Sequence, residues 1–347
     1  MKKISVLIAV RNEEQNILSC LNHLDKSIAK FYQKESQDNF EIEILVGDDN
    51  SEDKSAEIIK EFIQKNEKLN FTYFNIENEN NLKGKVKVVS QLIDISEGET
   101  IILLDADIFV TQNWLKELLT NFYQNDAIKM LMGTTIPKLD SNTFQTLDWI
   151  FGQGVLAMFS TLGFPQTAMG NNLIFDKKIY QEIGGYQNIE FSVTEDLALF
   201  KAFGCWWGHQ KRQDNFFTHL FSPNALAFTE SEPTLKDWIL QRHRWLVGAW
   251  QFSNSIKKVI LLIYLFRALI FIGMLLSGQI YIVLSVVCLL AINFFLLLSF
   301  FVRLKLKISF STLFQILFFS LSESILYFLV GIYFLTSKKV KWKGREF

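Results

Sequence analysis

The feature that most constrains the fold is a regular alternation of apolar runs and amphipathic segments over residues 4–133. The apolar runs predict strands at residues 4–10, 41–47, 71–76, 101–105 and 128–133. Between them, apolar residues spaced three and four apart predict helices at residues 14–32 and 114–123, and two more that carry residues 58–63 and 86–93. Strands that alternate with single helices indicate an α/β fold with a mostly parallel sheet and right-handed crossovers.

Acidic side chains follow two strands of this predicted sheet. Asp105 and Asp107 come directly after the apolar run 101–104, and Asp48 and Asp49 follow the second strand. Ligand sites in open α/β sheets lie beyond the carboxyl ends of strands, so we expect both clusters at one edge. Carboxylates can hold Mg²⁺ or Mn²⁺, which can hold a diphosphate, and a carboxylate can accept an N–H from a pyrimidine ring. Turn and helix-cap chemistry is the alternative role for either cluster.

Other sequence signals narrow the class of protein. The first strand is not followed by G-x-G-x-x-G, and the chain has no G-x-x-x-x-G-K-S/T, which argues against dinucleotide and P-loop enzymes. A net charge of −1 argues against a nucleic-acid partner. The three cysteines share no close spacing, so the sequence indicates neither a zinc site nor a disulfide framework.

Two further polar groups lie in the middle of the chain. Gly170 and Asn171 fall in a strand-like stretch at residues 168–175, where a glycine allows another group to approach the backbone closely. Glu195 and Asp196 open a predicted helix. A capping box that starts three residues before Glu195 would account for that glutamate but not for Asp196. An acid at a helix start is free to point into a cleft and act as a base.

The next predicted helix carries Gln241, Arg244 and Trp245 three and four positions apart, and therefore on one face. Arginine suits phosphate, and an indole suits the apolar face of a sugar ring. The alternative is a helix at the membrane surface, in which Arg242, His243 and Arg244 contact lipid headgroups and the tryptophan is an interfacial anchor.

The C-terminal part of the chain is far more hydrophobic than the rest. Residues 259–302 contain a single charge, Arg267, and residues 312–335 contain only Glu323. A membrane span needs about 20 apolar residues, so we expect segments near 259–279, 280–302 and 312–335. The expected domains are a catalytic domain over 1–255, a membrane domain over 256–337 and a basic tail over 338–347. Three full spans would place this tail against the positive-inside rule, and a re-entrant last segment is the alternative.

Taken in order, these motifs resemble the family 2 glycosyltransferases with the GT-A fold. The matching segments are SVLIAVRNEE, DDNSED, Gly84-Lys85, Asp105-Ala106-Asp107, Gly170-Asn171, Thr194-Glu195-Asp196 and Gln241-x-x-Arg244-Trp245. They follow the family's order and approximate spacing. The last motif narrows the resemblance to the membrane-bound branch, which includes cellulose, chitin and hyaluronan synthases and ceramide-glucosyltransferase-like enzymes.

The resemblance implies roles on the donor side. Asp49, or alternatively Asp48, would contact the uracil ring of a UDP-sugar, and Lys85 and Arg244 would lie near its phosphates. Asp107 would ligate Mg²⁺ or Mn²⁺, and Asp105 would contact the metal or the nucleotide sugar. Two residues, Lys87 and Ser90, stand where the family usually has a small residue and Asn.

The resemblance also implies roles on the acceptor side. Asp196 would be the general base, and the acceptor would be contacted by Gly170, Asn171, Glu195, Gln241 and Trp245. The implied function is inverting, metal-dependent transfer from a nucleotide sugar to a lipid or lipid-linked acceptor. The implied location is an integral membrane protein with its catalytic domain in the cytoplasm. A processive or short-chain polysaccharide synthase is the alternative, and an inactive nucleotide-sugar-binding membrane subunit is an alternative of another class.

Overall fold

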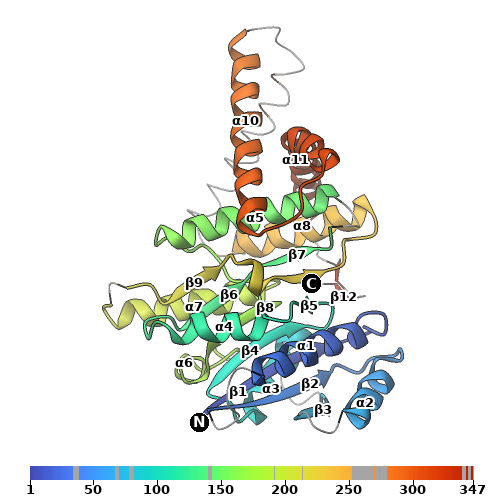
Figure 1. Ribbon diagram of the computed structural model, residues 1–347, viewed down its shortest axis with the longest axis vertical. Coiled ribbons are helices and arrows are strands. Elements are labelled where there is room, and N and C mark those ends of the chain that lie inside the picture. The colour runs from blue at the N-terminus through green and yellow to red at the C-terminus, as the bar shows by residue number, and fades with distance from the viewer. Residues whose placement is uncertain are drawn as a thin grey trace. The chain divides into compact units, whose positions relative to one another are not determined.

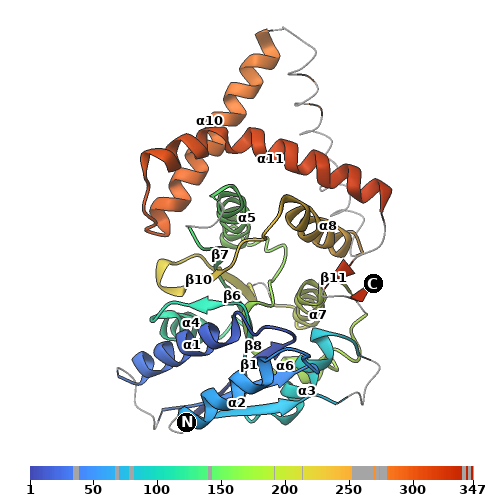
Figure 2. The ribbon, with the colours of Figure 1, turned by 90° about the vertical axis from the view of Figure 1, so that its right-hand side faces the viewer.

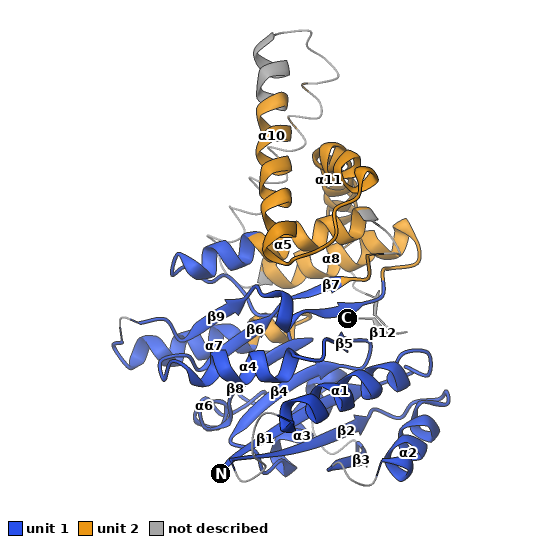
Figure 3. Ribbon diagram, in the orientation of Figure 1, with its two compact units in different colours: residues 1–136, 155–190, 199–230 blue, residues 137–154, 191–198, 231–347 orange. Residues whose placement is uncertain are grey.

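The computed structural model describes residues 1–33, 39–66, 70–77, 82–139, 143–190, 192–212, 214–251, 269, 273, 280–337, 341–342 and 345–346. The chain divides into two compact units (Figure 3). Unit 1 comprises residues 1–136, 155–190 and 199–230, and unit 2 comprises residues 137–154, 191–198 and 231–347. The first predicted membrane segment, near 259–279, lies outside the described residues except for Leu269 and Gly273.

Unit 1 is built on a seven-stranded sheet with the order β3-β2-β1-β4-β8-β6-β9 (Figure 1). The strands are β1 (Lys2–Val10), β2 (Phe40–Asp48), β3 (Phe71–Asn75), β4 (Thr100–Asp105), β6 (Met130–Gly133), β8 (Asn172–Asp176) and β9 (Phe217–Leu220). The five predicted strands are confirmed, and β3, β2, β1 and β4 are parallel neighbours. A smaller sheet has the order β5-β10-β7, formed by β5 (Phe109–Val110), β10 (Ala227–Thr229) and β7 (Thr135–Pro137).

The strand-like stretch at residues 168–175 differs from the prediction. Only its second half is a strand, β8, and this strand runs antiparallel to both β4 and β6. The direction of a strand cannot be predicted from an apolar run, because both directions bury the same side chains. Since β8 is antiparallel to β4, the first residues of β8 lie at the edge where β4 ends, with Asn172 opposite Leu104.

Helices cover both faces of the sheet because side chains alternate along each strand. On one face, Ile4, Val6 and Ile8 of β1 share a core with helices α1 (Ile17–Tyr32), α2 (Ser55–Lys65) and α4 (Trp114–Tyr123). On the other, α3 (Lys85–Ile95) packs against β2, where Gly47 leaves room for Val88 and Leu92. The α1, α3 and α4 predictions are confirmed, with α1 beginning three residues later than expected.

The loops that follow β1 and β2 are joined by hydrogen bonds. Helix α2 begins at Ser55, whose N–H is accepted by Asp53 Oδ1 at 2.9 Å, while the N-cap residue Lys54 makes no side-chain cap bond. Ser51 Oγ accepts the N–H of Asn12 at 3.0 Å, and Asp53 Oδ2 accepts the N–H of Glu14 at 3.0 Å. The turn after β2 is therefore tied to the turn after β1, next to Asp48 and Asp49.

Unit 2 contains the C-terminal helices α8 (Leu235–Gln251), α10 (Ile280–Arg303) and α11 (Phe310–Thr336), together with the first part of α5 (Thr143–Thr161). Helix α11 packs against both α8 and α10 (Figure 2). Its contact with α8 is a small core of Trp238, Leu246, Leu326 and Val330. The tail contains a two-stranded pair, β11 (Lys341–Trp342) and β12 (Arg345–Glu346).

Among the described residues, α11 is the one helix that is long and apolar enough to cross a membrane by length and composition. It matches the predicted segment at 312–335. The predicted segment at 280–302 corresponds to α10, whose residues Val287–Arg303 form a shorter apolar helix. Between these two helices, Asn293 donates to Ser320 Oγ at 2.7 Å, and Glu323 is buried one turn further along α11.

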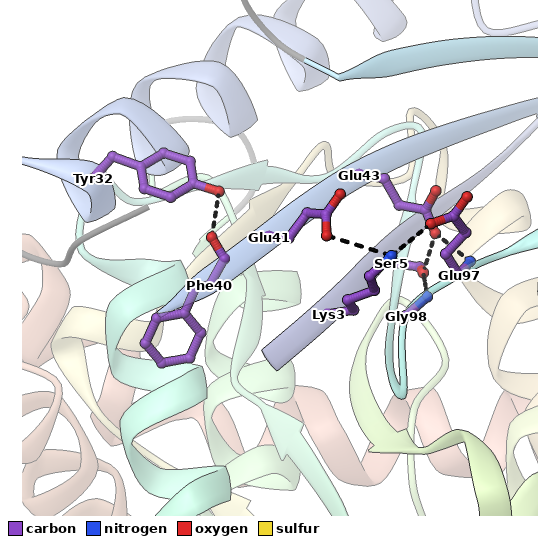
Figure 4. A network of polar contacts seen from close by, with 8 residues as sticks. All are labelled: Lys3, Ser5, Tyr32, Phe40, Glu41, Glu43, Glu97 and Gly98. Carbon is purple, nitrogen blue, oxygen red and sulfur yellow. Dashed lines mark hydrogen bonds and ion pairs between the residues drawn. The ribbon is translucent and has the colours of Figure 1, made fainter. Parts of the chain in front are cut away.

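The amino-terminal edge of the parallel strands is held by a separate polar network (Figure 4). Ser5 Oγ donates to Glu43 at 2.5 Å and accepts the N–H of Gly98 at 2.8 Å. Glu43 also accepts the N–H of Glu97 at 2.7 Å. These bonds join β1, β2 and the turn before β4, at the opposite end of the strands from the aspartates.

Replacing Gly98 by alanine should destabilise this edge. The new Cβ would lie 2.4 Å from the backbone nitrogen of Ser5, which cannot move without disturbing β1. We expect a loss of about 1–3 kcal/mol in the free energy of unfolding, measured by urea denaturation in detergent. Gly208→Ala is the matched control, since nothing lies within 4 Å of its added Cβ. Equal stability of the two variants would contradict the close approach.

Candidate functional site

Both acidic clusters lie at the same edge of the sheet, as predicted. In the strand register, Asp48 lies opposite Val10 and Asp105 lies opposite Ala9, so β1 separates the two acids. Neighbouring strands are about 4.8 Å apart, which places the two strand ends roughly 10 Å from each other. That separation suits the two ends of an extended ligand better than one compact ion site.

The first turn of α3 supplies a lysine to each acidic cluster. Lys85 Nζ lies 2.5 Å from Asp105 Oδ1 and 3.3 Å from the carbonyl oxygen of Gly170. Lys87 Nζ lies 2.6 Å from Asp49 Oδ1, and both of these side chains are about 95% buried. Two residues on a helix point about 200° apart, so one turn can reach both strand ends. Gly84, at φ 63°, forms the N-cap of this helix.

The adjacent aspartates Asp48 and Asp49 have different surroundings. Asp48 accepts hydrogen bonds from Ser51 N at 3.0 Å, Ser51 Oγ at 2.5 Å and Tyr73 Oη at 3.0 Å. Burial, together with the negative charge of Asp48, raises the pKa of Tyr73 to about 12. Asp49 instead faces cations, because Arg11 Nη1 lies 3.6 Å from its Oδ2 in addition to the Lys87 contact. Asp48 therefore has the turn contacts that the sequence allowed as its alternative role.

Asp105 and Asp107 act electrostatically on one buried thiol. Burial, and then the charges of Asp107 and Asp105, raise the pKa of Cys20, whose Sγ lies 3.6 Å from the carbonyl oxygen of Asp105. Mg²⁺ is commonly held by one or two carboxylates plus substrate phosphates, so this donor set fits such an ion. Within the described part of the chain, no group of three or more His, Cys, Asp or Glu side chains is arranged to hold a metal.

The start of β8 lies beside Asp105. Asn171 accepts the N–H of Asp105 through its carbonyl oxygen at 3.4 Å. Its side-chain Oδ1 is buried and has no hydrogen-bond partner among the described residues. The next residue, Asn172, is fully buried and accepts the indole N–H of Trp114 at 2.9 Å. The structure thus brings Gly170 and Asn171 to the same strand end as Lys85 and Asp105.

In unit 2, helix α8 carries the three residues of the last motif. Gln241 Nε2 donates to Glu232 Oε1 at 2.6 Å, while Gln241 Oε1 is buried with no partner among the described residues. Glu232 also exchanges two 2.9 Å hydrogen bonds with Gln145 through its backbone. Burial raises the pKa of Glu232, and the positive charge of Arg244 opposes this shift.

The membrane-surface alternative for this helix is wrong for two of its residues. Arg242 and His243 are buried, whereas headgroup contacts would need them exposed. Arg242 Nε donates to Asp148 Oδ2 at 2.8 Å, and His243 Nε2 lies 2.9 Å from the carbonyl oxygen of Ser337. Burial lowers the pKa of His243. Through these contacts, Arg242 joins α8 to α5 and His243 joins α8 to the end of α11.

The start of α7 (Glu195–His209) packs against the end of α8 within unit 2. A Cβ on Gly248 would lie 2.2 Å from Thr194 Oγ1, so only glycine allows this approach. Thr194 precedes Glu195 and donates its N–H to Ser192 Oγ at 3.1 Å. Asp196 Oδ1 accepts the N–H of Leu197 at 2.8 Å. The position of Glu195 and Asp196 therefore depends on α8.

Sequence reasoning missed several residues at these sites. Lys87 stood out only as a departure from the family pattern, and its partner Asp49 is distant in sequence. Arg11 lies in the matching segment SVLIAVRNEE but had no role assigned to it, and Asp148 and Glu232 gave no signal, since each is an ordinary charged residue in its segment. Their partners become visible only when the elements are packed.

Replacing Lys87 by methionine should remove the 2.6 Å ion pair with Asp49 Oδ1 and leave a buried carboxylate with one cation fewer. Removing one partner of a buried ion pair costs about 3–5 kcal/mol, so we expect a loss of that size in urea denaturation. Lys65→Met is the control, because its pair with Glu61 has the same chemistry but is exposed, with a 3.0 Å separation. The control should lose about 0.5 kcal/mol or less. Similar losses in both variants would rule out a buried pair.

The sequence matches the family described as "Glycosyl transferase family 2" over residues 5–184 and that described as "Glycosyl transferase family group 2" over residues 100–336. It is 24% identical over 287 residues to the poly-beta-1,6-N-acetyl-D-glucosamine synthase of Staphylococcus epidermidis, covering 76% of this chain and 64% of that protein. It is 26% identical over 258 residues to the beta-monoglucosyldiacylglycerol synthase of Nostoc sp., covering 72% and 49%.

The chain thus spans about half to two thirds of the length of the curated relatives it matches. Among solved structures, the fold is similar to a mannosyltransferase from Pyrobaculum calidifontis in complex with GDP-Man and Mn²⁺. The TM-score is 0.57 at 12% identity, with 96% of this chain and 87% of that chain covered. The GT-A fold expected from the motifs is confirmed. The sheet with its two acidic strand ends, and the family match over more than half of the chain, lead to one conclusion: this chain belongs to glycosyltransferase family 2.

Proposed function

We propose that this glycosyltransferase moves a sugar from a UDP-sugar to a hydroxyl group of a lipid or lipid-linked acceptor at the cytoplasmic face of a membrane. The observation that carries the proposal is that two strand ends carry acids, and that the first turn of α3 supplies a lysine to each: Lys87 to Asp49 and Lys85 to Asp105. Asp49 would accept an N–H of the base, and Lys85 would meet the phosphates. The roughly 10 Å between the strand ends suits a base at one and a diphosphate at the other.

The donor set at the second strand end supports a divalent cation. Asp107 and Asp105 would hold Mg²⁺ or Mn²⁺, which would supply positive charge against the departing diphosphate. Lys85 and Arg244 would add to that charge. The solved mannosyltransferase contains Mn²⁺ together with its nucleotide sugar, which is consistent with this assignment.

The proposed reaction is a single in-line displacement. Asp196 would take the proton from the acceptor hydroxyl, whose oxygen attacks the anomeric carbon as the bond to the diphosphate breaks. The configuration at that carbon would invert. Glu195, Gln241 and Trp245 would hold the acceptor, with Gly170 and Asn171 at the strand end. The buried side-chain oxygens of Asn171 and Gln241, for which the described part of the chain supplies no donor, support this assignment, because sugar hydroxyls could donate to them.

Several observations favour a lipid acceptor and a membrane domain over residues 256–337. One relative is named for a glucosyldiacylglycerol product, and α11 has the length and composition of a span. Large apolar side chains on α10 and α11 are exposed, which soluble surfaces rarely allow in such number. They are Val287, Ile292, Phe295, Val302, Phe310, Phe314, Leu317, Phe318, Leu321, Ile325, Phe328, Ile332 and Leu335. The second candidate is a polysaccharide synthase, favoured by the Staphylococcus relative.

The test is release of nucleoside diphosphate from UDP-glucose, UDP-galactose, UDP-N-acetylglucosamine and GDP-mannose by membranes containing the protein. Each donor is supplied with and without Mn²⁺ or Mg²⁺ and lipid extract. Metal-dependent UDP release with radiolabel in the organic phase supports the proposal. Label in insoluble polymer supports the second candidate instead. A donor that binds but is never turned over would overturn both.

Two substitutions separate the proposed roles. Asp107→Ala should abolish metal-dependent UDP release, because a cation ligand is lost. Asp196→Asn should lower turnover by about 10²–10⁴-fold, the usual contribution of a positioned base, while nucleotide binding is kept. Asp126→Asn, at an exposed aspartate, is the control and should match wild type. Full turnover by Asp196→Asn would exclude this residue as the base.

A further inference from the structure

A buried ion pair joins α5 to α8 inside unit 2. Arg242 donates two hydrogen bonds, through Nε at 2.8 Å and through Nη2, to the same Oδ2 atom of Asp148. The side chains of the two residues are 7% and 5% exposed. Their charges therefore balance each other within the packed interior between the two helices.

The same guanidinium lies on the indole ring of Trp245. Its Cζ is 4.1 Å from the ring centroid, within the range of a cation–π contact. Trp149, one residue after Asp148, meets the same ring edge-on at 5.2 Å between centroids. Arg242 covers a face of Trp245 and Trp149 meets it at an angle, while Trp245 remains partly exposed. Two residues of α5, Asp148 through Arg242 and Trp149 directly, thus fix the ring plane of Trp245 on α8.

Stability alone does not explain this arrangement. Replacing a buried ion pair by apolar residues of similar volume is often neutral or stabilising, because desolvation offsets most of the attraction. Methionine and leucine could fill the same space. What they could not do is hold a planar cation, fixed by two hydrogen bonds, against one face of an indole.

We propose that Asp148 and Arg242 are positioning residues that set the orientation of Trp245 and thereby determine how tightly the acceptor binds. The inference rests on the proposed acceptor role of Trp245. Asp148 acts through Arg242, and neither residue touches the substrate. The donor contacts proposed above, Asp49, Lys85 and Arg244, keep their side chains when the pair is replaced, so we expect donor binding to be unaffected.

The main variant replaces both partners, Asp148→Leu together with Arg242→Met, so that no charge is left buried and the protein folds. We expect the KM for the acceptor to rise about tenfold, the effect of losing a contact of cation–π strength, while the KM for the donor stays within twofold. Arg242→Lys is the second variant. It keeps the charge but loses the planar guanidinium, and should show the same selective rise.

The control removes an ion pair elsewhere, by Glu61→Leu with Lys65→Met at the exposed pair on α2. It should leave both KM values unchanged. Combining the main variant with Trp245→Ala should add nothing to the effect of Trp245→Ala alone, because the pair acts only through that ring. Independent, multiplying effects would overturn the inference, as would an unchanged acceptor KM in the folded double variant.

A readout independent of activity separates this inference from the proposed function. Protein labelled with 5-fluorotryptophan gives one fluorine signal for each tryptophan, and Trp245→Phe identifies the signal of Trp245. In the double variant that signal should shift or broaden, while the signal of Trp114, which is buried in the core of unit 1, stays in place. An unmoved Trp245 signal would overturn the inference even if wild type turns over no acceptor. If the Trp245 signal moves in a protein that turns over no donor, the positioning role is supported and the proposed function is contradicted.

Discussion

The geometry of unit 1 depends on neutralising two acidic groups that one sheet edge brings together. Parallel strands end at the same edge of a sheet, so the acids at the ends of β2 and β4 lie at one edge with β1 between them. Without counter-charges, Asp49 would be buried at a high electrostatic cost. Lys85 and Lys87 meet this requirement from a single helix turn, which ties the N-terminus of α3 to both strand ends. The turn after β1 contributes Arg11 to the same balance.

In unit 2, contacts with residues from other segments likewise fix the position of α8. In the middle of this helix Glu232 binds Gln241 and Asp148 binds Arg242, and Thr194 lies against its last turn at Gly248. A helix held in its middle and at its end presents its remaining side chains in defined directions. Helix α8 therefore links the orientation of its own motif to the start of α7, where Glu195 and Asp196 lie.

Most elements of unit 1 could be predicted because their hydrophobic periods are strong and their helices are separated by short turns. The direction of β8 could not, because an apolar run reads the same in both directions. At the candidate site, Asp48, Asp49 and Asp105 were predicted from their place at or after the ends of strands, and Lys85 was predicted from the family resemblance. Lys87 was noticed without its partner, since a contact between residues 38 positions apart leaves no local pattern.

The charges of α8 show the same limit. Consecutive basic residues beside tryptophan look like headgroup contacts until the packing partners are known. Arg242 can be buried because it donates to Asp148 on α5, and His243 because its Nε2 contacts the carbonyl oxygen of Ser337, which follows α11. A periodicity argument places residues on a face of a helix, but it does not say what that face meets.

The buried amide of Asn172 has a consequence for how this protein can vary. Its contacts with Trp114 and Thr135, and the absence of a side chain on Gly133 beside it, hold β8 in one register. A slip by one residue would put Leu173 among these polar partners and turn every later side chain to the wrong face. We therefore expect insertions and deletions between the end of α5 and Met169 to leave the register of β8 unchanged. Gly170 and Asn171 are excluded from this freedom, because their carbonyl oxygens contact Lys85 and Asp105.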